Sequence, residues 1–333
     1  MSAVSSAPGI RQCLILGRGI GQVMFQNNAL TGLLFLIGIF WGAYASGTPA
    51  VGWGAVVGVV ASTLSGWLLN RRGEPASDGD QGLWGFNGVL VGCAFPTFMT
   101  PDWAMWVALV FCAMLTTWLR RGFNNVMAPW KVNSFTFPFV FSTWVFLLCC
   151  HELGMLHGAG MAHPSIEVAT STEFHASFIT LVEAWLRGIS QVFLIDSWIT
   201  GLFFLAGLAV SSVRAAVWAA VGAAIALATA VIFRAPQADV MEGLYGFSAV
   251  LTAIALGATF YPRNTLAQIL WTVAGTIATV FVQACMNALF EPLGLATLTG
   301  PFCITTWLFL LPLYKVDQTP APDHSSWPSS SSK

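Results

Sequence analysis

Two glutamines at equivalent places in two copies of one short motif could bind a polar solute. Gln22 lies in GIGQV and Gln191 lies in GISQV. Each side chain has a carbonyl oxygen that accepts hydrogen bonds and an amide nitrogen that donates them. In apolar surroundings such a group needs a protein partner or a polar cavity. Either glutamine alone could simply brace a helix, but the pair favours a pathway with two similar mouths. Phe25 lies on the same helical face as Gln22, whereas its counterpart is Leu194.

Two phenylalanine–leucine pairs are also duplicated. Phe86 and Leu90 lie in GFNGVL, and Phe247 and Leu251 lie in GFSAVL. Residues four apart share one face of a helix. Core packing is the ordinary role of one such pair. Two copies, each beside glycine residues, indicate two flat apolar slots through which a planar solute could slide.

A threonine precedes a proline by two residues in each of two further matched segments. Thr136 lies in FTFPF and Thr299 lies in LTGPF. Proline has no N–H group and is favoured in the first turn of a helix, where threonine is a common cap. Such a helix end carries free peptide groups and a positive dipole end. We therefore expect the two hydroxyls to line the midpoint of a pore as well as to start helices.

Carboxylates are scarce close to the apolar segments. Asp196 and Glu291 are the two that lie nearest, and Asn27 stands where the other half has Asp196. A proton- or sodium-coupled transporter carries buried ionisable groups, so their scarcity favours a passive pathway for a neutral solute. The sequence holds no phosphate-binding loop, catalytic constellation or metal-ligand cluster, and predicts neither an enzyme nor a cofactor nor nucleic-acid binding.

The elements that position these residues belong in a membrane, surrounded by lipid. Mean hydropathy is +0.73, with 56% hydrophobic and 8% charged residues, against roughly 25% charged residues in soluble domains. Residues 19–38 recur at 188–207 with 10 of 20 positions identical, and residues 82–94 recur at 243–255 with 7 of 13 identical. Two homologous halves in an apolar chain are typical of transporters and channels with a pathway between the halves.

Uncharged runs separated by basic residues predict ten spans, five in each half. Arginines at the intervening loops fit an orientation with both termini in the cytoplasm. An odd number of spans in each half then requires the halves to be inserted in opposite directions. The predicted organisation is an all-α integral membrane protein with a first inverted repeat at 1–150, an extracytoplasmic connecting segment at 151–182, a second inverted repeat at 183–315 and a disordered Ser/Pro-rich cytoplasmic tail at 316–333.

Several segments do not fit simple spans. Residues 13–28 and 182–197 are too short to cross, and we expect half-membrane or steeply tilted helices there. Paired Gly- and Pro-interrupted segments at equivalent places point to a substrate path; here they are 82–98, 243–260, 129–138 and 292–301.

Six segments resemble the motifs of the urea transporter family, in its bacterial form. They are GIGQVMFQNNALTG, GLWGFNGVL and NSFTFPF, with their partners GISQVFLIDSWITG, GLYGFSAVL and ATLTGPFC. The resemblance covers roughly residues 15–315. It implies a homotrimer in the cell inner membrane, among membrane lipids, in which each subunit has its own pore. It also implies two inverted halves of five helices with an added half-membrane pore helix each, and energy-independent permeation of urea.

The resemblance also assigns roles to residues. Gln22 and Gln191 would flank the two ends of the filter, and Thr136 and Thr299 would mark its midpoint. The remaining wall residues would be Val23, Phe25, Phe86, Leu90, Val192, Leu194, Phe247 and Leu251. Leu194 replaces an expected aromatic residue, which bears on fine selectivity. A channel for other small amides or ammonia, and an ion-coupled transporter that uses Asp196 or Glu291, remain the alternatives.

Overall fold

The computed structural model describes residues 8–70, 76–159, 176–261 and 265–313. These residues form helices joined by turns, and Met99 and Gly158 make an isolated bridge. The predicted tail at 316–333 and residues 160–175 of the predicted connecting segment lie outside the described residues.

Among the described residues, four helices are long and apolar enough to cross a membrane. They are α3 (Pro49–Asn70), α6 (Trp103–Met127), α10 (Val213–Ile232) and α13 (Leu266–Phe290). Large apolar side chains on outward faces are exposed, among them Phe111 at 61% and Leu270 at 59%. Such faces are stable in lipid and unfavourable in water. The protein is therefore a multi-pass membrane protein.

Two helix pairs are sharply bent. α1 (Pro8–Gly21) meets α2 (Ala29–Ala45) at 75°, and α8 (Phe178–Ser190) meets α9 (Trp198–Ser211) at 71°. Each bend follows a short 3-10 turn, Gln22–Met24 or Gln191–Phe193. The next residue, Phe25 or Leu194, has a left-handed backbone that ends the helix. The expectation that 13–28 and 182–197 are not simple spans is thereby confirmed.

Four other apolar helices are short. They are α5 (Phe86–Phe98), α7 (Phe137–Cys149), α12 (Phe247–Ile254) with its π-helical continuation Ala255–Thr259, and α14 (Gly300–Leu310). At 1.5 Å per residue, a helix of 13 residues such as α5 measures about 20 Å, short of the roughly 30 Å of a bilayer core. Turns or extended chain precede each of them. These helices are therefore interrupted elements rather than the full spans that an uncharged run suggests.

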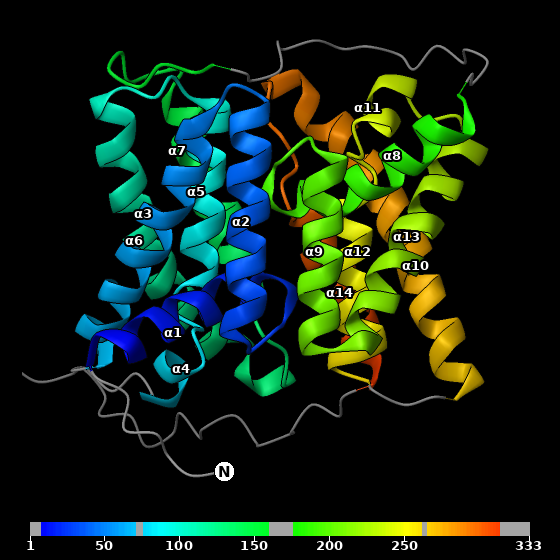
Figure 1. Cartoon of the computed structure of the whole chain (residues 1–333), viewed down its shortest axis with the longest axis horizontal. Helices are drawn as coiled ribbons and strands as arrows, with labels where there is room; N and C mark the ends of the chain where they lie inside the picture. Colours follow the sequence, from blue (N-terminus) through cyan, green and yellow to red (C-terminus); the bar gives the residue numbers. More distant parts are fainter. Residues whose placement is uncertain (1–7, 71–75, 160–175, 262–264, 314–333) are drawn as a thin grey trace, which may run out of the picture.

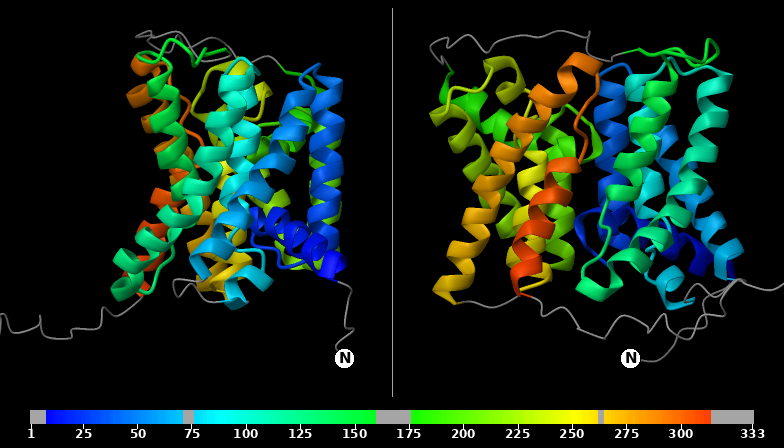
Figure 2. Two further views of the ribbon diagram at one scale, coloured as in Figure 1. Left: turned by 90° about the vertical axis from the view of Figure 1, so that its left-hand side faces the viewer. Right: turned by 180° about the vertical axis from the view of Figure 1, so that it is seen from behind.

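The order of elements in the first half is repeated in the second. α1 to α7 correspond in sequence to α8 to α14, including the short helices α4 (Ala76–Asp80) and α11 (Gln237–Met241). The packing partners also correspond, because α3 packs on α5 and α6, and α10 packs on α12 and α13. α1 and α4 lie at the lower end of the molecule in Figure 1, whereas α8 and α11 lie at the upper end. The two further views agree (Figure 2).

The halves meet along α2 and α9. Thr31 Oγ1 donates to the carbonyl of Gly207 at 2.8 Å, and Thr200 Oγ1 donates to the carbonyl of Gly38 at 2.8 Å. Both threonines are fully buried. Glycine lets the two backbones approach closely, and the buried hydroxyls satisfy helix carbonyls across the contact. The two reciprocal hydrogen bonds hold the halves in register.

Candidate functional site

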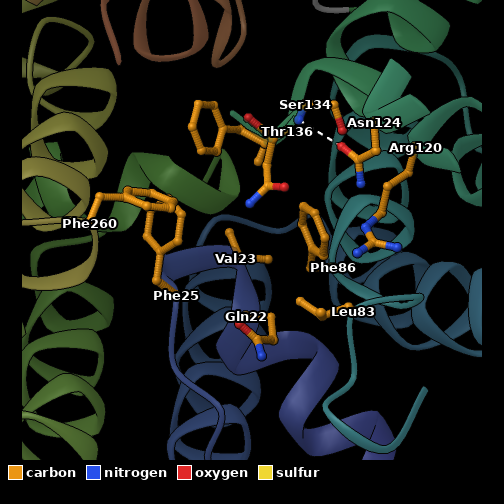
Figure 3. A pocket seen from close by; sticks show the side chains of 12 residues that line it. Gln22, Val23, Phe25, Leu83, Phe86, Arg120, Asn124, Ser134, Thr136 and Phe260 are labelled. Carbon is orange, nitrogen blue, oxygen red and sulfur yellow. Dashed lines mark hydrogen bonds between the residues drawn. The ribbon is translucent and has the colours of Figure 1, made fainter. Parts of the chain in front are cut away.

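Two cavities are lined by residues at matching positions of the two halves. The first cavity, of about 100 Å³, is shown in Figure 3. Its wall consists of Gln22, Val23, Phe25, Leu83, Phe86, Arg120, Asn124, Asn133, Ser134, Phe135, Thr136 and Phe260. The second cavity, of about 390 Å³, is lined by the counterparts Gln191, Val192, Leu194, Leu244, Phe247, Gln283, Asn287, Ala296, Thr297, Leu298 and Thr299, together with Thr97, Phe98, Phe139, Asp196 and Leu295.

The two threonines at the expected midpoint contact each other. Thr136 Oγ1 and Thr299 Oγ1 are 2.7 Å apart, although the residues are 163 positions apart in the chain. Both side chains are buried. Thr136 lines the first cavity and Thr299 lines the second, so the cavities adjoin at this hydrogen bond.

Each threonine is also the residue before a short helix. Thr136 precedes α7 and Thr299 precedes α14, and neither hydroxyl makes a capping hydrogen bond to its own helix. The two hydroxyls therefore do not act as the side-chain caps that the sequence predicts. Instead they hydrogen-bond to each other at the junction of the cavities, where the positive ends of two helix dipoles also lie.

Both glutamines are held by the same contact in their own half. Gln22 Nε2 donates to the carbonyl of Gln81 at 2.9 Å, and Gln191 Nε2 donates to the carbonyl of Glu242 at 3.0 Å. Each glutamine therefore braces its own half through Nε2 and also lines a cavity. Because the nitrogen is anchored, Oε1 is the atom through which either side chain can accept a hydrogen bond from a solute.

The chain at the cavity walls has unusual backbone geometry. Phe25 and Phe135 have φ of 63° and 50°, and their counterparts Leu194 and Leu298 have φ of 58° and 50°. Left-handed backbone is uncommon for such side chains. Strained residues of this kind gather at functional sites, where the surrounding structure holds them. The same strain in both halves marks these four positions as parts of one kind of site.

Tryptophans fix the extended chain in front of the short helices. Trp307 Nε1 donates to the carbonyl of Asn133 at 2.9 Å, and Trp144 Nε1 donates to the carbonyl of Ala296 at 2.9 Å. Each tryptophan belongs to the half opposite to its acceptor. In the first half, Asn124 Oδ1 also accepts from the backbone nitrogen of Ser134 at 2.8 Å (Figure 3). These contacts position the peptide groups at the cavity wall.

Aromatic rings fill much of the space beside the first cavity. The ring of Phe25 makes edge contacts with Phe135, Phe260 and Phe302 at centroid distances of 6.3, 5.8 and 6.0 Å. In the second half, leucines stand in place of Phe25 and Phe135, at Leu194 and Leu298. The smaller volume of the first cavity is consistent with this difference.

Most expected site residues line one of the cavities, and two do not. Leu90 and Leu251 are fully buried in the core and are absent from both walls. Other lining residues were missed at the sequence level, among them the matched pairs Leu83 and Leu244, Arg120 and Gln283, Asn124 and Asn287, and Phe135 and Leu298. The first and last of these four pairs lie inside the duplicated motifs, where position alone could have identified them.

Charge distinguishes the two mouths. In the first half, Arg120 and Asp78 form an ion pair at 2.8 Å, and both are largely buried. In the second half, Gln283 stands in place of Arg120, while Asp239 stands in place of Asp78. Burial, followed by the charge of Glu291, raises the pKa of Asp239. The carboxyl therefore lies in an environment that disfavours its charge.

More carboxylates surround the second mouth. Burial raises the pKa of Glu242, the charges of Asp196 and Asp239 raise it further, and Arg187 opposes them. Arg187 lies 3.1 Å from Asp196 and 3.4 Å from Glu183. One arginine is thus shared among several acids at this mouth.

The fold and the paired cavities are those of a multi-pass membrane transport protein. The described residues hold no group of His, Cys, Asp and Glu suited to a metal ion. Residues 13–314 match the family model described as "Urea transporter". The chain belongs to the urea transporter family, whose members are transport proteins and not enzymes.

Curated relatives are similar over most of the chain. Urea transporter 1 of Ovis aries is 28% identical over 297 residues, which is 88% of this chain and 75% of the relative. Urea transporter 1 of Mus musculus is 29% identical over 301 residues, with the same coverage.

Proposed function

We propose that the protein is a passive channel for urea, with the pathway running from the first cavity past the threonine pair into the second cavity. The observation that carries this proposal is the contact between Thr136 and Thr299 at the junction of two cavities with matching walls. Family membership supports urea as the solute.

The chemistry of the wall suits a planar neutral molecule with N–H donors. Urea loses several kcal/mol on leaving water unless its donors find new partners. Oxygen atoms of Gln22, the two threonines and Gln191 are spaced along the pathway as acceptors, while Phe86 and Phe247 provide apolar faces. Hydrated ions gain nothing from these faces. Weak binding at several places lets the solute leave as readily as it enters.

We further propose that the halves are inverted repeats. The repeated element order and the placement of α1 and α8 at opposite ends support this arrangement (Figure 1). Basic residues at the lower end, among them Arg11 and Arg18, support a cytoplasmic location for that end in the inner membrane. The homotrimer stays a prediction from the family resemblance, and native mass spectrometry of the purified protein would test it.

Ion-coupled transport is the alternative from another mechanistic class. The side chain of Asp196 is 51% exposed and lies beside Arg187, which is unlike the buried ionisable groups of coupled transporters. Flux that follows a proton or sodium gradient, or concentrative uptake, would favour this alternative. Competition by acetamide, formamide and methylurea would reveal a channel for other small amides.

The test is stopped-flow light scattering of proteoliposomes under an inward urea gradient without an ion gradient. We expect protein-dependent re-swelling that falls at least about tenfold in Thr299→Val, because a solute donor then loses its acceptor at the junction of the cavities. Thr305→Val is the matched control, since Thr305 is buried in the same helix and its Oγ1 has no hydrogen-bond partner among the described residues. Unchanged urea flux in folded Thr299→Val protein would remove the threonine from the mechanism.

A further inference from the structure

Two of the short helices have a phenylalanine at each end, and the two rings of each helix line different cavities. Phe86 at the start of α5 lines the first cavity, and Phe98 at its end lines the second. In the other half the order is reversed. Phe247 at the start of α12 lines the second cavity, and Phe260, which follows the π-helical continuation, lines the first. Each half therefore contributes one aromatic ring to the cavity of the other half.

The spacing of the two rings differs by one residue between the helices. The phenylalanines are 12 positions apart in α5 and 13 apart in α12 with its continuation. Successive residues of an α-helix point about 100° apart, so one extra residue would turn the second ring away from the cavity. The π-helix Ala255–Thr259 accommodates the extra residue, because the backbone nitrogen of Phe260 donates to the carbonyl of Ala255, five positions earlier, at 2.8 Å. Such π-helical turns are rare and are frequent at functional sites.

Two side chains from neighbouring helices hold the carbonyl groups of this π-helix. Gln268 Nε2 in α13 donates to the carbonyl of Leu256 at 2.9 Å, and Arg214 Nε in α10 donates to the carbonyl of Gly257 at 2.7 Å. A buried carbonyl without a donor is unfavourable, so both contacts stabilise the π-helix. The position of α6 that matches Gln268 is occupied by Met105, which has no side-chain N–H group. The contact from Gln268 is therefore specific to the second half.

We infer that Phe260 determines which neutral amides pass the first cavity, and that Gln268 is a positioning residue that holds the Phe260 ring there through the π-helix. The ring admits urea and restricts amides that carry an additional methyl group. This inference rests on the proposed function, and it names a residue that selects among solutes by size within the same pathway.

The ring contacts of Phe260 support this role. Its centroid is 5.8 Å from that of Phe25, which lies beside it in Figure 3, and 5.5 Å from that of Phe135. Both partners have left-handed backbone, with φ of 63° and 50°, and the surrounding structure holds them in place. A solute with one more methyl group therefore requires Phe260 to move. In the second cavity, which is larger, Phe98 shares the wall with leucines instead.

Stopped-flow measurements of urea and N-methylurea flux into proteoliposomes test the selectivity. Phe260→Ala should raise the ratio of methylurea flux to urea flux about tenfold, the lower end of what an apolar wall achieves against one methyl group. Phe260→Leu should raise this ratio less, and it keeps the test valid if the alanine variant does not fold. Thr305→Val is the control and should leave the ratio unchanged.

The positioning role is tested by the residue that the first half has at the matching place. Gln268→Met removes the donor at similar volume and should raise the flux ratio about threefold. In the Phe260→Ala background the same change should have no further effect, since the ring that it displaces is absent. A residue with a general structural role would act equally in both backgrounds.

The position of the ring can also be followed without urea flux. With 4-fluorophenylalanine at position 260 of the full-length protein, Gln268→Met should shift the ¹⁹F NMR resonance, and Thr305→Val should not. Unchanged flux ratios in folded Phe260→Ala and Phe260→Leu would overturn the selectivity, and an unmoved resonance in Gln268→Met would overturn the positioning role. If wild-type protein conducts neither solute, the proposed channel is removed, and the resonance still decides whether Gln268 positions the ring.

Discussion

The first and second halves place the same kinds of residue around their cavities, but the two cavities differ in charge and in volume. The first cavity is small, and its wall includes four phenylalanine rings and an arginine that is paired with a carboxylate. The second has nearly four times the volume (390 against 100 Å³), has leucines in place of two of those rings, and has several carboxylates at its mouth. The shared features, which are the glutamine, the threonine and the strained turns, line the proposed pathway. The features that differ give the two cavities different charge and volume.

Packing differs between the halves as well. In α5, a Cβ atom added to Gly92 would lie 2.0 Å from the carbonyl oxygen of Gly54 in α3, which is an impossible approach. The matching residue of α12 is Ala253. The first half therefore depends on glycine for the contact between two helix backbones, and the second half accommodates a methyl group there.

The largest expected effect comes from the paired aspartates. Asp78→Asn should lower the free energy of unfolding by about 3 kcal/mol, because it removes the carboxylate from a buried arginine. Asp239→Asn should leave stability at pH 7 unchanged or increase it, because that carboxyl carries an unfavourable charge. Thermal denaturation followed by tryptophan fluorescence would measure both. Similar losses in the two variants would contradict the proposed asymmetry.

The same pair gives a pH dependence with a definite sign. The pKa of Asp239 is raised in the folded protein, so the proton binds more tightly to the folded state than to the unfolded state. Its contribution to stability is complete below about pH 4, the ordinary value, and is lost as pH rises through the folded-state pKa. The advantage of Asp239→Asn over wild type should therefore disappear below about pH 4. An advantage that is constant with pH would have another cause.

The next largest effect is expected at the contact between α3 and α5. Gly92→Ala should lower the free energy of unfolding by about 2 kcal/mol, since backbone must move to admit the methyl group. The reverse change in the other half, Ala253→Gly, should cost about 1 kcal/mol through the helix propensity of glycine. Thermal denaturation of both variants tests the difference. A Gly92→Ala protein as stable as wild type would show that α3 and α5 can separate at little cost.

Duplication made much of the site predictable from sequence. A glutamine or threonine that recurs at the same place in both halves stands out, and Gln22, Gln191, Thr136 and Thr299 all line the cavities. The sequence also indicated that segments 13–28 and 182–197 are not simple spans, because they are short and polar for a membrane. Helical periodicity shows which residues share one face of a helix, but it does not show how deeply each of them is buried.

The remaining features were less accessible for identifiable reasons. Leu90 and Leu251 lie one turn beyond Phe86 and Phe247, in the packed core rather than at a wall. Arg120 and Gln283 lie in long helices and differ in type, so no repeated letter links them. Because arginine is replaced by glutamine, a comparison of the two halves does not show that Arg120 and Gln283 correspond. The same replacement produces the charge difference between the two cavities.

The smallest expected effect comes from exchanging the residues at the two left-handed turns. Phe25→Leu removes a ring that contacts three others beside the first cavity. If this cavity limits passage, the variant should raise urea flux on the order of threefold. Such a change corresponds to less than about 1 kcal/mol in the barrier to permeation. Leu194→Phe should lower flux by less, because the second cavity has room for the larger side chain. Stopped-flow measurements on matched proteoliposomes would compare them. A larger loss in Leu194→Phe than the gain in Phe25→Leu would place the resistance to urea in the second half, and the volumes of the two cavities would then not determine the rate.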